Sequence, residues 1–252
     1  TSDDFRFVRA FWEVDPRRIA RSREETRRGK KWVPFAKGGE YSPYWADVHL
    51  LVNYGNDGQE LRSFSGSVIR NPQYYFRAGL TWPPRTNSAF GIRVLPGGCV
   101  FGHKGPAAFT SGANRYVSLV WLNSRIVRAS IDAMVAAGEE VSSGGASRSY
   151  EVGLVQRLPW VPALSDSVRL RELAFEIIES RRLEDTSDDT TRSFVRSAVL
   201  PHLVKDNSFI DAVEATIRER NTRWNSILNA TLEAENEIHR IVEIDEDTLA
   251  YL

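Results

Sequence analysis

The C-terminal part of the chain carries an apolar stripe at helical spacing, and this stripe constrains the fold more than any other feature of the sequence. The stripe consists of Phe209, Val213, Ile217, Trp224, Leu228, Leu232, Ile238 and Val242. It predicts one amphipathic helix over 207–243, which would exceed about 45 Å at about 1.5 Å per residue. Asp206 or Asn207 is a suitable N-cap for this helix. Segments 166–183 and 189–204 also have helical patterns, so we predict that the C-terminal region is α-helical.

Residues 1–165 have the pattern of mixed strands and loops. The expected elements are a strand at 5–14, a helix at 16–29, a hairpin at 47–64, two strands within 90–105, a helix at 114–137, a loop at 142–147 and a strand at 149–162. The hairpin turn is placed at 55–58, because glycine, asparagine and aspartate tolerate positive φ. Proline, serine and a reversal of charge coincide at 162–167. The sequence therefore predicts an α+β fold with a mixed-strand domain (1–165) and an α-helical region (166–252).

The composition is that of a globular protein in a reducing compartment. Hydrophobic residues make up 42% and charged residues 26% of the chain, which argues against wholesale disorder. No apolar run approaches the roughly 20 residues that span a bilayer, and no signal peptide is visible. The single cysteine, Cys99, allows no internal disulfide and no cysteine-rich metal cluster. We therefore expect a cytoplasmic protein with no membrane partner, and the abrupt apolar start suggests a piece of a longer polypeptide.

The charge of the chain is zero in total but unevenly distributed. Residues 1–165 contain 22 Lys and Arg against 14 Asp and Glu, whereas residues 166–252 contain 11 against 19. Such asymmetry is typical of a protein in which one part faces a polyanion, although many soluble proteins show a milder form without functional meaning. The N-terminal region is thus the candidate for binding nucleic acid.

The segment Asn71-Pro72-Gln73-Tyr74 is similar to the Asn-Pro-Pro-Tyr catalytic box of amino-methylating DNA methyltransferases. In that box polar groups hold the target amine while the aromatic ring stacks on the flipped base. These enzymes bind S-adenosylmethionine at a Gly-rich turn after the first strand of a doubly wound sheet, and we find no such unit in this sequence. Gln73 also replaces the second proline. We therefore interpret Asn71-Pro72 as a turn that leads into a strand.

Other catalytic patterns are also missing from the sequence. Segment 64–68 (FSGSV) lacks the second glycine of a hydrolase Gly-x-Ser-x-Gly elbow. None of the four histidines has a partner at the spacing of a zinc site, and we identify no carboxylate cluster of a metal-dependent nuclease. Cys99 lies in an apolar strand, where packing is more usual than nucleophilic chemistry. The sequence therefore offers no catalytic residue and no metal ligand.

Five segments occur in an order that resembles a known family. They are WVPFAKGGEYSPYWADVHLLVNYGNDGQEL, NPQYYFRAGLTWPPRT, GCVFGHKGPAAF, LVWLNSRIVRASI and SYEVGLVQRLPW, within residues 32–160. This order resembles the target-recognition region of large bacterial adenine-specific DNA methyltransferases, namely Eco57I-like type II restriction–modification enzymes and the methyltransferases of BREX- or DISARM-type phage-defence systems. Segment 231–252 resembles their helical tail, without its usual Tyr-Gly pair. The resemblance implies that a catalytic domain, which binds S-adenosylmethionine, lies N-terminal to this region in a longer parent protein.

Two sets of side chains are candidates for contact with duplex DNA. Lys and Arg supply affinity through phosphates, while base edges supply specificity; Arg and Lys suit guanine, and Asn suits adenine. The first set is a basic segment with Arg17, Arg21, Arg28, Lys30 and Lys31. The second set consists of Arg70, Arg77, Thr81, Arg85, Thr86, Asn87, Arg93, His103 and Lys104. The basic segment could equally be a solvated surface helix, and Trp82 is better explained by core packing.

Two functions from different classes are compatible with these observations. In the first, the chain reads a DNA target and holds the duplex while the attached methyltransferase domain flips out and methylates adenine, because a stacked base is unreachable. In the second, the chain is a protein–protein assembly module of a defence complex and reads no sequence. The acidic helical region would brace the recognition domain or dock another subunit of the defence system.

Overall fold

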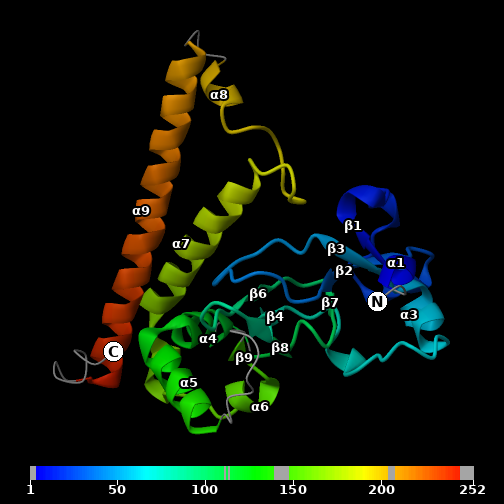
Figure 1. Ribbon diagram of the computed structural model, residues 1–252, viewed down its shortest axis with the longest axis horizontal. Helices are drawn as coiled ribbons and strands as arrows, with labels where there is room; N and C mark the ends of the chain where they lie inside the picture. The colour runs from blue at the N-terminus through cyan, green and yellow to red at the C-terminus, as the bar shows by residue number, and fades with distance from the viewer. Residues whose placement is uncertain (1–3, 111, 113, 139–147, 204–207, 245–252) are drawn as a thin grey trace. The chain divides into compact units, whose positions relative to one another are not determined.

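The computed structural model describes residues 4–110, 112, 114–138, 148–203 and 208–244, with side chains omitted at 135–138. These residues form two compact units (Figure 1). As far as they are described, unit 1 comprises Thr1–Ser42, Val48–Thr110 and Ser143–Gln156, and unit 2 comprises Pro43–Asp47, Ser111–Ser142 and Arg157–Leu252. Mixed strands and a helical C-terminal region confirm the predicted α+β class. The division at residue 165 into functional domains stays a prediction.

Unit 1 contains a four-stranded sheet with β3 (Leu50–Asn53) in its interior. β3 pairs antiparallel with β1 (Val8–Ala10) and with β2 (Trp32–Ala36), and β2 pairs in parallel with β7 (Val100–Phe101). Short helical segments flank these strands: α1 (Asp4–Phe7), η1 (Phe11–Glu13), η2 (Pro16–Arg18), α2 (Arg23–Arg27) and α3 (Gly55–Arg62). The core on this sheet consists of Ala20, Val33, Val52, Tyr54, Tyr75 and Val100.

A second, three-stranded sheet in unit 1 is centred on β4 (Gly79–Thr81). β4 pairs antiparallel with β6 (Arg93–Leu95) on one side and β8 (Ala107–Ala108) on the other. A two-stranded ladder joins β5 (Arg85–Thr86) to β9 (Arg148–Ser149). Trp82 follows β4 and is buried, as we expected of a core residue, and its indole N–H donates to the carbonyl oxygen of Tyr150 at 2.8 Å.

The predicted hairpin over 47–64 is wrong. Asn56, Asp57 and Gly58 do have positive φ values of 48°, 57° and 78°, but the chain then continues as the helical turn of α3 instead of a second strand. β1 and β2 occupy both edges of β3, so no edge is left for a hairpin partner. Long-range pairing has therefore overridden a local turn signal.

Other elements of unit 1 are shorter than predicted or of another type. The strand at 5–14 is reduced to β1, because helical turns precede and follow it. The helix at 16–29 is split, since Pro16 begins η2 and Ser22 caps α2 by accepting the N–H of Glu25. Segment 90–105 contains two strands, β6 and β7, which pair in different sheets. Segment 149–162 begins with the end of β9 and continues as α6 (Val152–Val155), so the predicted strand is wrong. The loop at 142–147 lies outside the described residues.

The regular secondary structure in the described part of unit 2 is helical. Its elements are α4 (Asn114–Asn123), α5 (Arg125–Gly138), η4 (Pro162–Asp166), α7 (Val168–Asp185), α8 (Leu200–Leu203) and α9 (Phe209–Val242). The single helix predicted at 114–137 is broken at Ser124, whose hydroxyl accepts the N–H of Val127 at 3.3 Å. The helix predicted at 189–204 is wrong except for α8. Thr191 donates to the carbonyl oxygen of Asp185 at 2.6 Å, a side-chain to backbone bond that competes with helix formation.

α9 has the predicted position and length, with 34 residues and therefore about 51 Å at about 1.5 Å per residue. Its N-cap is Ser208, which forms a capping box with Asp211; Asp206 and Asn207 lie outside the described residues. α7 packs antiparallel to the C-terminal part of α9 (Figure 1). Arg169 binds Glu233 at 2.6 Å across this contact. In the described residues no helix is long and apolar enough to cross a membrane.

The face of α9 that packs is not the stripe of large residues. The buried positions are Ala212, Ile227, Ala230, Ala234, Glu235 and Ile238. Much of the stripe is exposed, with Ile217 at 53%, Trp224 at 50% and Leu228 at 60%. α9 thus buries one face, which includes Ile238 of the stripe, and leaves Ile217, Trp224 and Leu228 at least half exposed on a second face, which we call the outer face of α9. Arg181 of α7 lies over the Trp224 ring at 4.8 Å.

Candidate nucleic-acid interface

A tight turn with two basic side chains follows β7, and its glycines pack against the end of β2. We call residues 101–105 the basic turn. The N–H of Gly102 donates to the carbonyl oxygen of Ala36 at 3.2 Å, and the N–H of Gly105 donates to that of Gly102 at 2.9 Å. A Cβ placed on Gly105 would lie 2.8 Å from the carbonyl carbon of Ala36, closer than carbon atoms pack. The glycines therefore allow the close approach, and His103 and Lys104 between them are exposed.

The loop after β4 reaches the same edge of unit 1. Thr81 pairs antiparallel with Ala107, so the residues after Thr81 run alongside the residues before Ala107. Gly38 lies close to both Pro84 and Lys104: a Cβ placed on Gly38 would be 3.8 Å from Pro84 Cδ and 3.4 Å from the carbonyl carbon of Lys104. Pro84 precedes the exposed Arg85. The structure thus brings Arg85 together with the basic turn.

Tyr150 anchors the loop that carries Arg85, Thr86 and Asn87. Its N–H donates to the carbonyl oxygen of Pro84 at 2.7 Å, and its hydroxyl donates to that of Ser88 at 3.3 Å. Arg85 and Asn87 are exposed, whereas the Thr86 hydroxyl accepts the N–H of Ser88 at 3.0 Å. Because the loop is fixed at both ends, its side chains would lose less conformational entropy on binding a ligand.

The strand pair β5–β9 carries a further basic residue next to this edge. Arg148 is exposed and lies opposite Thr86 in the ladder, so its side chain is on the other face of the ladder from Arg85. Nothing in the local sequence pattern singles out Arg148, because its position depends on pairing with a strand more than sixty residues away. We call Arg85, His103 and Lys104 the basic edge.

Two of the expected DNA contacts, Thr81 and Arg93, lie inside unit 1. Arg93 is 5% exposed, and its guanidinium donates to the carbonyl oxygens of Gly38 and, at 2.8 Å, of Glu40. Thr81 is 4% exposed and donates to the carbonyl oxygen of Pro106 at 2.8 Å. Burial lowers the pKa of Arg93 below its usual value. Both side chains hold backbone that flanks the basic turn, so we count them as positioning residues and not as part of the surface.

The basic segment 17–31 is largely neutralised by carboxylates. Its ion pairs are Arg17–Asp15 at 2.7 Å, Arg28–Glu24 at 2.5 Å, Lys30–Glu25 at 2.7 Å, Lys31–Glu60 at 3.0 Å, and Arg23 and Arg27 with Asp57. Hydrogen bonds from Arg17 lower the pKa of Asp15 to about 2. Arg21 is exposed. Exposed pairs of this kind contribute roughly 0–1 kcal/mol, so phosphate could displace the carboxylates, but the segment is less positive than its sequence suggests.

Arg77 lies over a pair of aromatic rings at the opposite end of the β4–β8 ladder. The rings of Tyr74 and Phe109 stack with centroids 5.0 Å apart, and the guanidinium is 5.3 and 5.6 Å from their centroids. Asn71 has a left-handed φ of 52° and precedes η3 (Pro72–Tyr74). The segment is thus a turn that leads towards β4, as predicted. Arg70, just before it, is exposed.

The described residues do not fit the usual site for S-adenosylmethionine. The segment most similar to that site is β3 together with α3, whose residues 55–58 form the turn after the strand. β3, however, lies between two antiparallel neighbours, whereas the cofactor site needs a parallel, doubly wound sheet. Among the same residues no group of three or more His, Cys, Asp and Glu is arranged to hold a metal ion.

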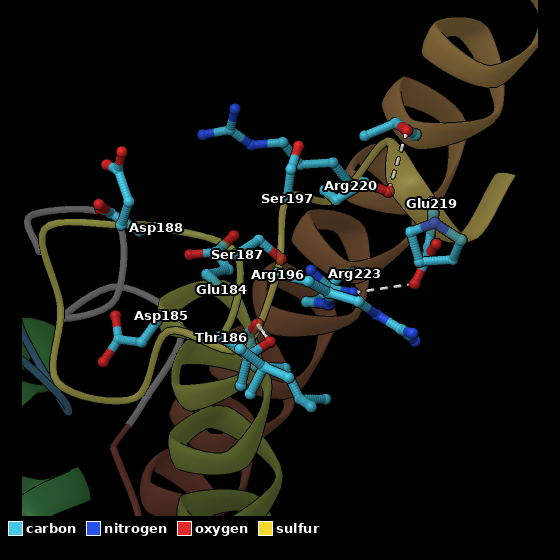
Figure 2. A pocket seen from close by; sticks show the side chains of 16 residues that line it. Glu184, Asp185, Thr186, Ser187, Asp188, Arg196, Ser197, Glu219, Arg220 and Arg223 are labelled. Atoms are coloured by element: carbon cyan, nitrogen blue, oxygen red, sulfur yellow. Dashed lines mark hydrogen bonds and ion pairs between the residues drawn. The ribbon is translucent and has the colours of Figure 1, made fainter. Parts of the chain in front are cut away.

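Unit 2 has a cleft of about 790 Å³ between the end of α7, the loop after it and α9 (Figure 2). Its charged lining residues are Arg196, Arg220 and Arg223 against Glu184, Asp185, Asp188, Asp189 and Glu219. Arg223 is paired with Glu219 at 3.1 Å. Burial raises the pKa of Asp185, which accepts the indole N–H of Trp45 at 2.6 Å. Because carboxylates outnumber arginines, this cleft is unsuited to a polyanion.

Comparison with known proteins places the chain among relatives of adenine-specific methyltransferases, at low identity. It is 27% identical over 175 residues to adenine-specific methyltransferase BrxX of Escherichia coli O9:H4 (strain HS), which covers 68% of this chain and 13% of the relative. It is 23% identical over 251 residues to adenine-specific methyltransferase PglX of Lacticaseibacillus casei (strain Zhang), which covers 96% of this chain and 20% of the relative. The chain thus spans a fifth or less of these relatives. No family model matches it.

Proposed function

We propose that this chain is the DNA target-recognition part of an adenine-specific DNA methyltransferase of a restriction–modification or phage-defence system. The basic edge carries the proposal, because its side chains extend from an anchored loop and a glycine-constrained turn. The similarity to two adenine-specific methyltransferases supports it. Catalysis, with S-adenosylmethionine as the methyl donor, would belong to another part of the parent protein.

In this proposal the basic edge binds phosphates and the adjoining loop reads bases. Lys104 would neutralise a phosphate and His103 would donate a hydrogen bond to one, which supplies affinity and sets the register on the duplex. Arg85 and Asn87 are the exposed side chains whose geometry suits guanine and adenine edges. The duplex would be held while the methyltransferase domain extracts the target adenine.

The test is a change of methylation target. A full-length relative is expressed with its own recognition segment, or with residues 32–160 of this chain in place of the corresponding segment, and the methylated motif is read by sequencing the host DNA. A new motif supports the proposal. An active chimaera that keeps the old motif would count against sequence reading by this chain.

The outer face of α9 favours a second candidate, in which the chain is an assembly module. Ile217, Trp224 and Leu228 are at least half exposed, and large exposed apolar patches often mark protein–protein contacts. The two candidates differ in which substitutions abolish function. If the double variant Arg85→Ala, Lys104→Ala loses methylation, DNA recognition is supported. If the double variant Ile217→Ser, Leu228→Ser loses methylation while the basic-edge variant keeps it, the assembly role is supported.

A further inference from the structure

A cavity of about 280 Å³ opens in unit 1 beside β7, and the proposed function does not use it. Six aromatic side chains line it: Phe7, Phe35, Tyr54, Phe64, Tyr75 and Phe101. The aliphatic side chains of Val8, Val52, Leu61, Val68, Ile69 and Val100 complete most of its wall. Protein cores are close-packed and their voids are few. Val52, Tyr54, Tyr75 and Val100 of this wall also belong to the core on the four-stranded sheet, so the cavity is an aromatic-lined opening into that core, and apolar openings of this kind suit a small ligand.

The size of the cavity selects a small, flat occupant. Pockets for drug-sized ligands measure about 300–1,000 Å³, so this cavity lies just below that range. Aromatic walls favour an aromatic ligand, because rings gain about 0.5–1.5 kcal/mol from stacked or edge-to-face contacts beyond the area they bury. A single heterocycle fits these conditions, whereas a peptide segment or a lipid chain does not.

Charged groups surround the mouth of the cavity. Asp4 lines the cavity, its side chain is 47% exposed, and its carboxylate accepts a hydrogen bond from Lys37 at 2.8 Å. Gly102 also lines the cavity, and His103 and Lys104 of the basic turn follow it directly. An apolar interior thus adjoins cations that could bind phosphate.

We propose that this cavity binds one nucleotide, with the base between the aromatic side chains and the phosphate on the basic turn. Enzymes that take a base out of the helix hold it in the same way, by stacking against aromatic and apolar side chains and by hydrogen bonds to its edge. The cavity would therefore stabilise a duplex from which a base has been extruded.

The mouth also sets a preference among the bases. The Asp4 carboxylate can only accept hydrogen bonds at neutral pH, because the bond from Lys37 lowers its pKa. It therefore suits a base with an exocyclic amino group, such as adenine or cytosine, over thymine, whose single N3–H donor lies between two carbonyl oxygens that repel the carboxylate. The Ser67 hydroxyl, also on the lining, can donate or accept.

The placement of the phosphate on the basic turn rests on the proposed function, since both use that turn. The base could come from DNA or from a free nucleotide, and two probes distinguish these sources. The first probe is adenosine or thymidine monophosphate in calorimetric titration. The second is a pair of duplexes that differ only in whether one adenine lies opposite thymine or opposite an abasic site, compared by fluorescence anisotropy.

Substitutions in one loop provide a matched comparison. Ser67→Trp fills the cavity, whereas Ser65→Trp places the same ring on an exposed residue that does not line it. We expect Ser67→Trp to weaken adenosine monophosphate binding at least tenfold and to abolish the preference for the unpaired adenine, and Ser65→Trp to change neither. Asp4→Asn keeps the shape of the side chain, so the fold is retained, and should remove the preference for adenine over thymine.

The outcomes separate the cavity from the proposed function. If the chain binds the nucleotide but shows no preference for unpaired adenine, and Ser67→Trp abolishes the nucleotide binding, the cavity is assigned to a free nucleotide. Absence of both effects overturns the inference, and so does an equal response of the two tryptophan variants. If duplex binding then still falls in Arg85→Ala with Lys104→Ala, the proposed function stands without the cavity.

Discussion

Alanine at Gly105 should disrupt the basic turn, and the structure indicates by how much. The added Cβ would lie 2.8 Å from the carbonyl carbon of Ala36 and 3.0 Å from the backbone nitrogen of Gly38. Carbon atoms pack at about 3.5 Å or more, so the two segments must separate by about 0.7 Å. Overpacking of this kind costs about 1–3 kcal/mol, and each hydrogen bond lost from the turn costs about 1 kcal/mol. We therefore expect Gly105→Ala to destabilise unit 1 by about 2–4 kcal/mol.

Gly97→Ala is the matched control. Its Cβ would meet no atom nearer than 3.8 Å, and neither Gly97 nor Gly105 has a positive φ. Replacing glycine by alanine restricts the unfolded chain equally in both variants, so that effect cancels in the comparison. Hydrogen exchange measured by mass spectrometry reports on unit 1 separately from unit 2. A loss of 2 kcal/mol corresponds to about thirtyfold faster exchange in peptides of β2 and β7, and similar exchange in the two variants would refute the crowding argument.

Two further predictions concern buried charged groups. Arg93→Met should destabilise unit 1 by about 2–4 kcal/mol, because two charge-assisted hydrogen bonds to carbonyl groups are lost, whereas the exposed Arg85→Met should have little effect; thermal unfolding of both variants checks this. Glu235 accepts the N–H of Arg125 at 3.0 Å, and burial raises its pKa. Protonated Glu235 therefore stabilises the folded state. This contribution to the free energy of unfolding is complete below the pKa of Glu235 in the unfolded chain, about 4.5, and is lost as the pH rises through the higher pKa of Glu235 in the folded protein. Glu235→Gln should therefore unfold at a higher temperature than the wild type at pH 7 and at a similar temperature at pH 4, and a lower temperature at pH 7 would contradict it.

The helices of unit 2 could be predicted where their pattern is long and periodic. α7 and α9 begin and end within a few residues of the expected positions. The packed face of α9 could not be predicted, because Ala230 and Ala234 allow close approach to α7 while larger residues remain outside. In the loop before α8, local side-chain hydrogen bonds of Asp188 and Thr191 replace the helix that the composition favours.

The strands of unit 1 were harder to predict, because their partners are distant in sequence. β3 pairs on both edges with strands that no local signal connects to it. The same limit applies to the site. Exposure of Arg85, His103 and Lys104 agrees with the turn signals around them. The burial of Arg93 and the ion pairs of the basic segment with Asp57 and Glu60 depend instead on tertiary contacts, whereas its pairs with Asp15, Glu24 and Glu25 are local.

The most direct test of the account is the salt dependence of duplex binding by this chain. Each phosphate contact contributes about 0.9 to the slope of log affinity against log salt concentration. If Lys104 contacts a phosphate and Arg85 a base edge, their double alanine variant should bind more weakly and lose about 0.9 from the slope. Arg157→Ala, at an exposed position of unit 2, should leave the slope unchanged. A double variant with the affinity and slope of the wild type would contradict the assignment of the basic edge to DNA.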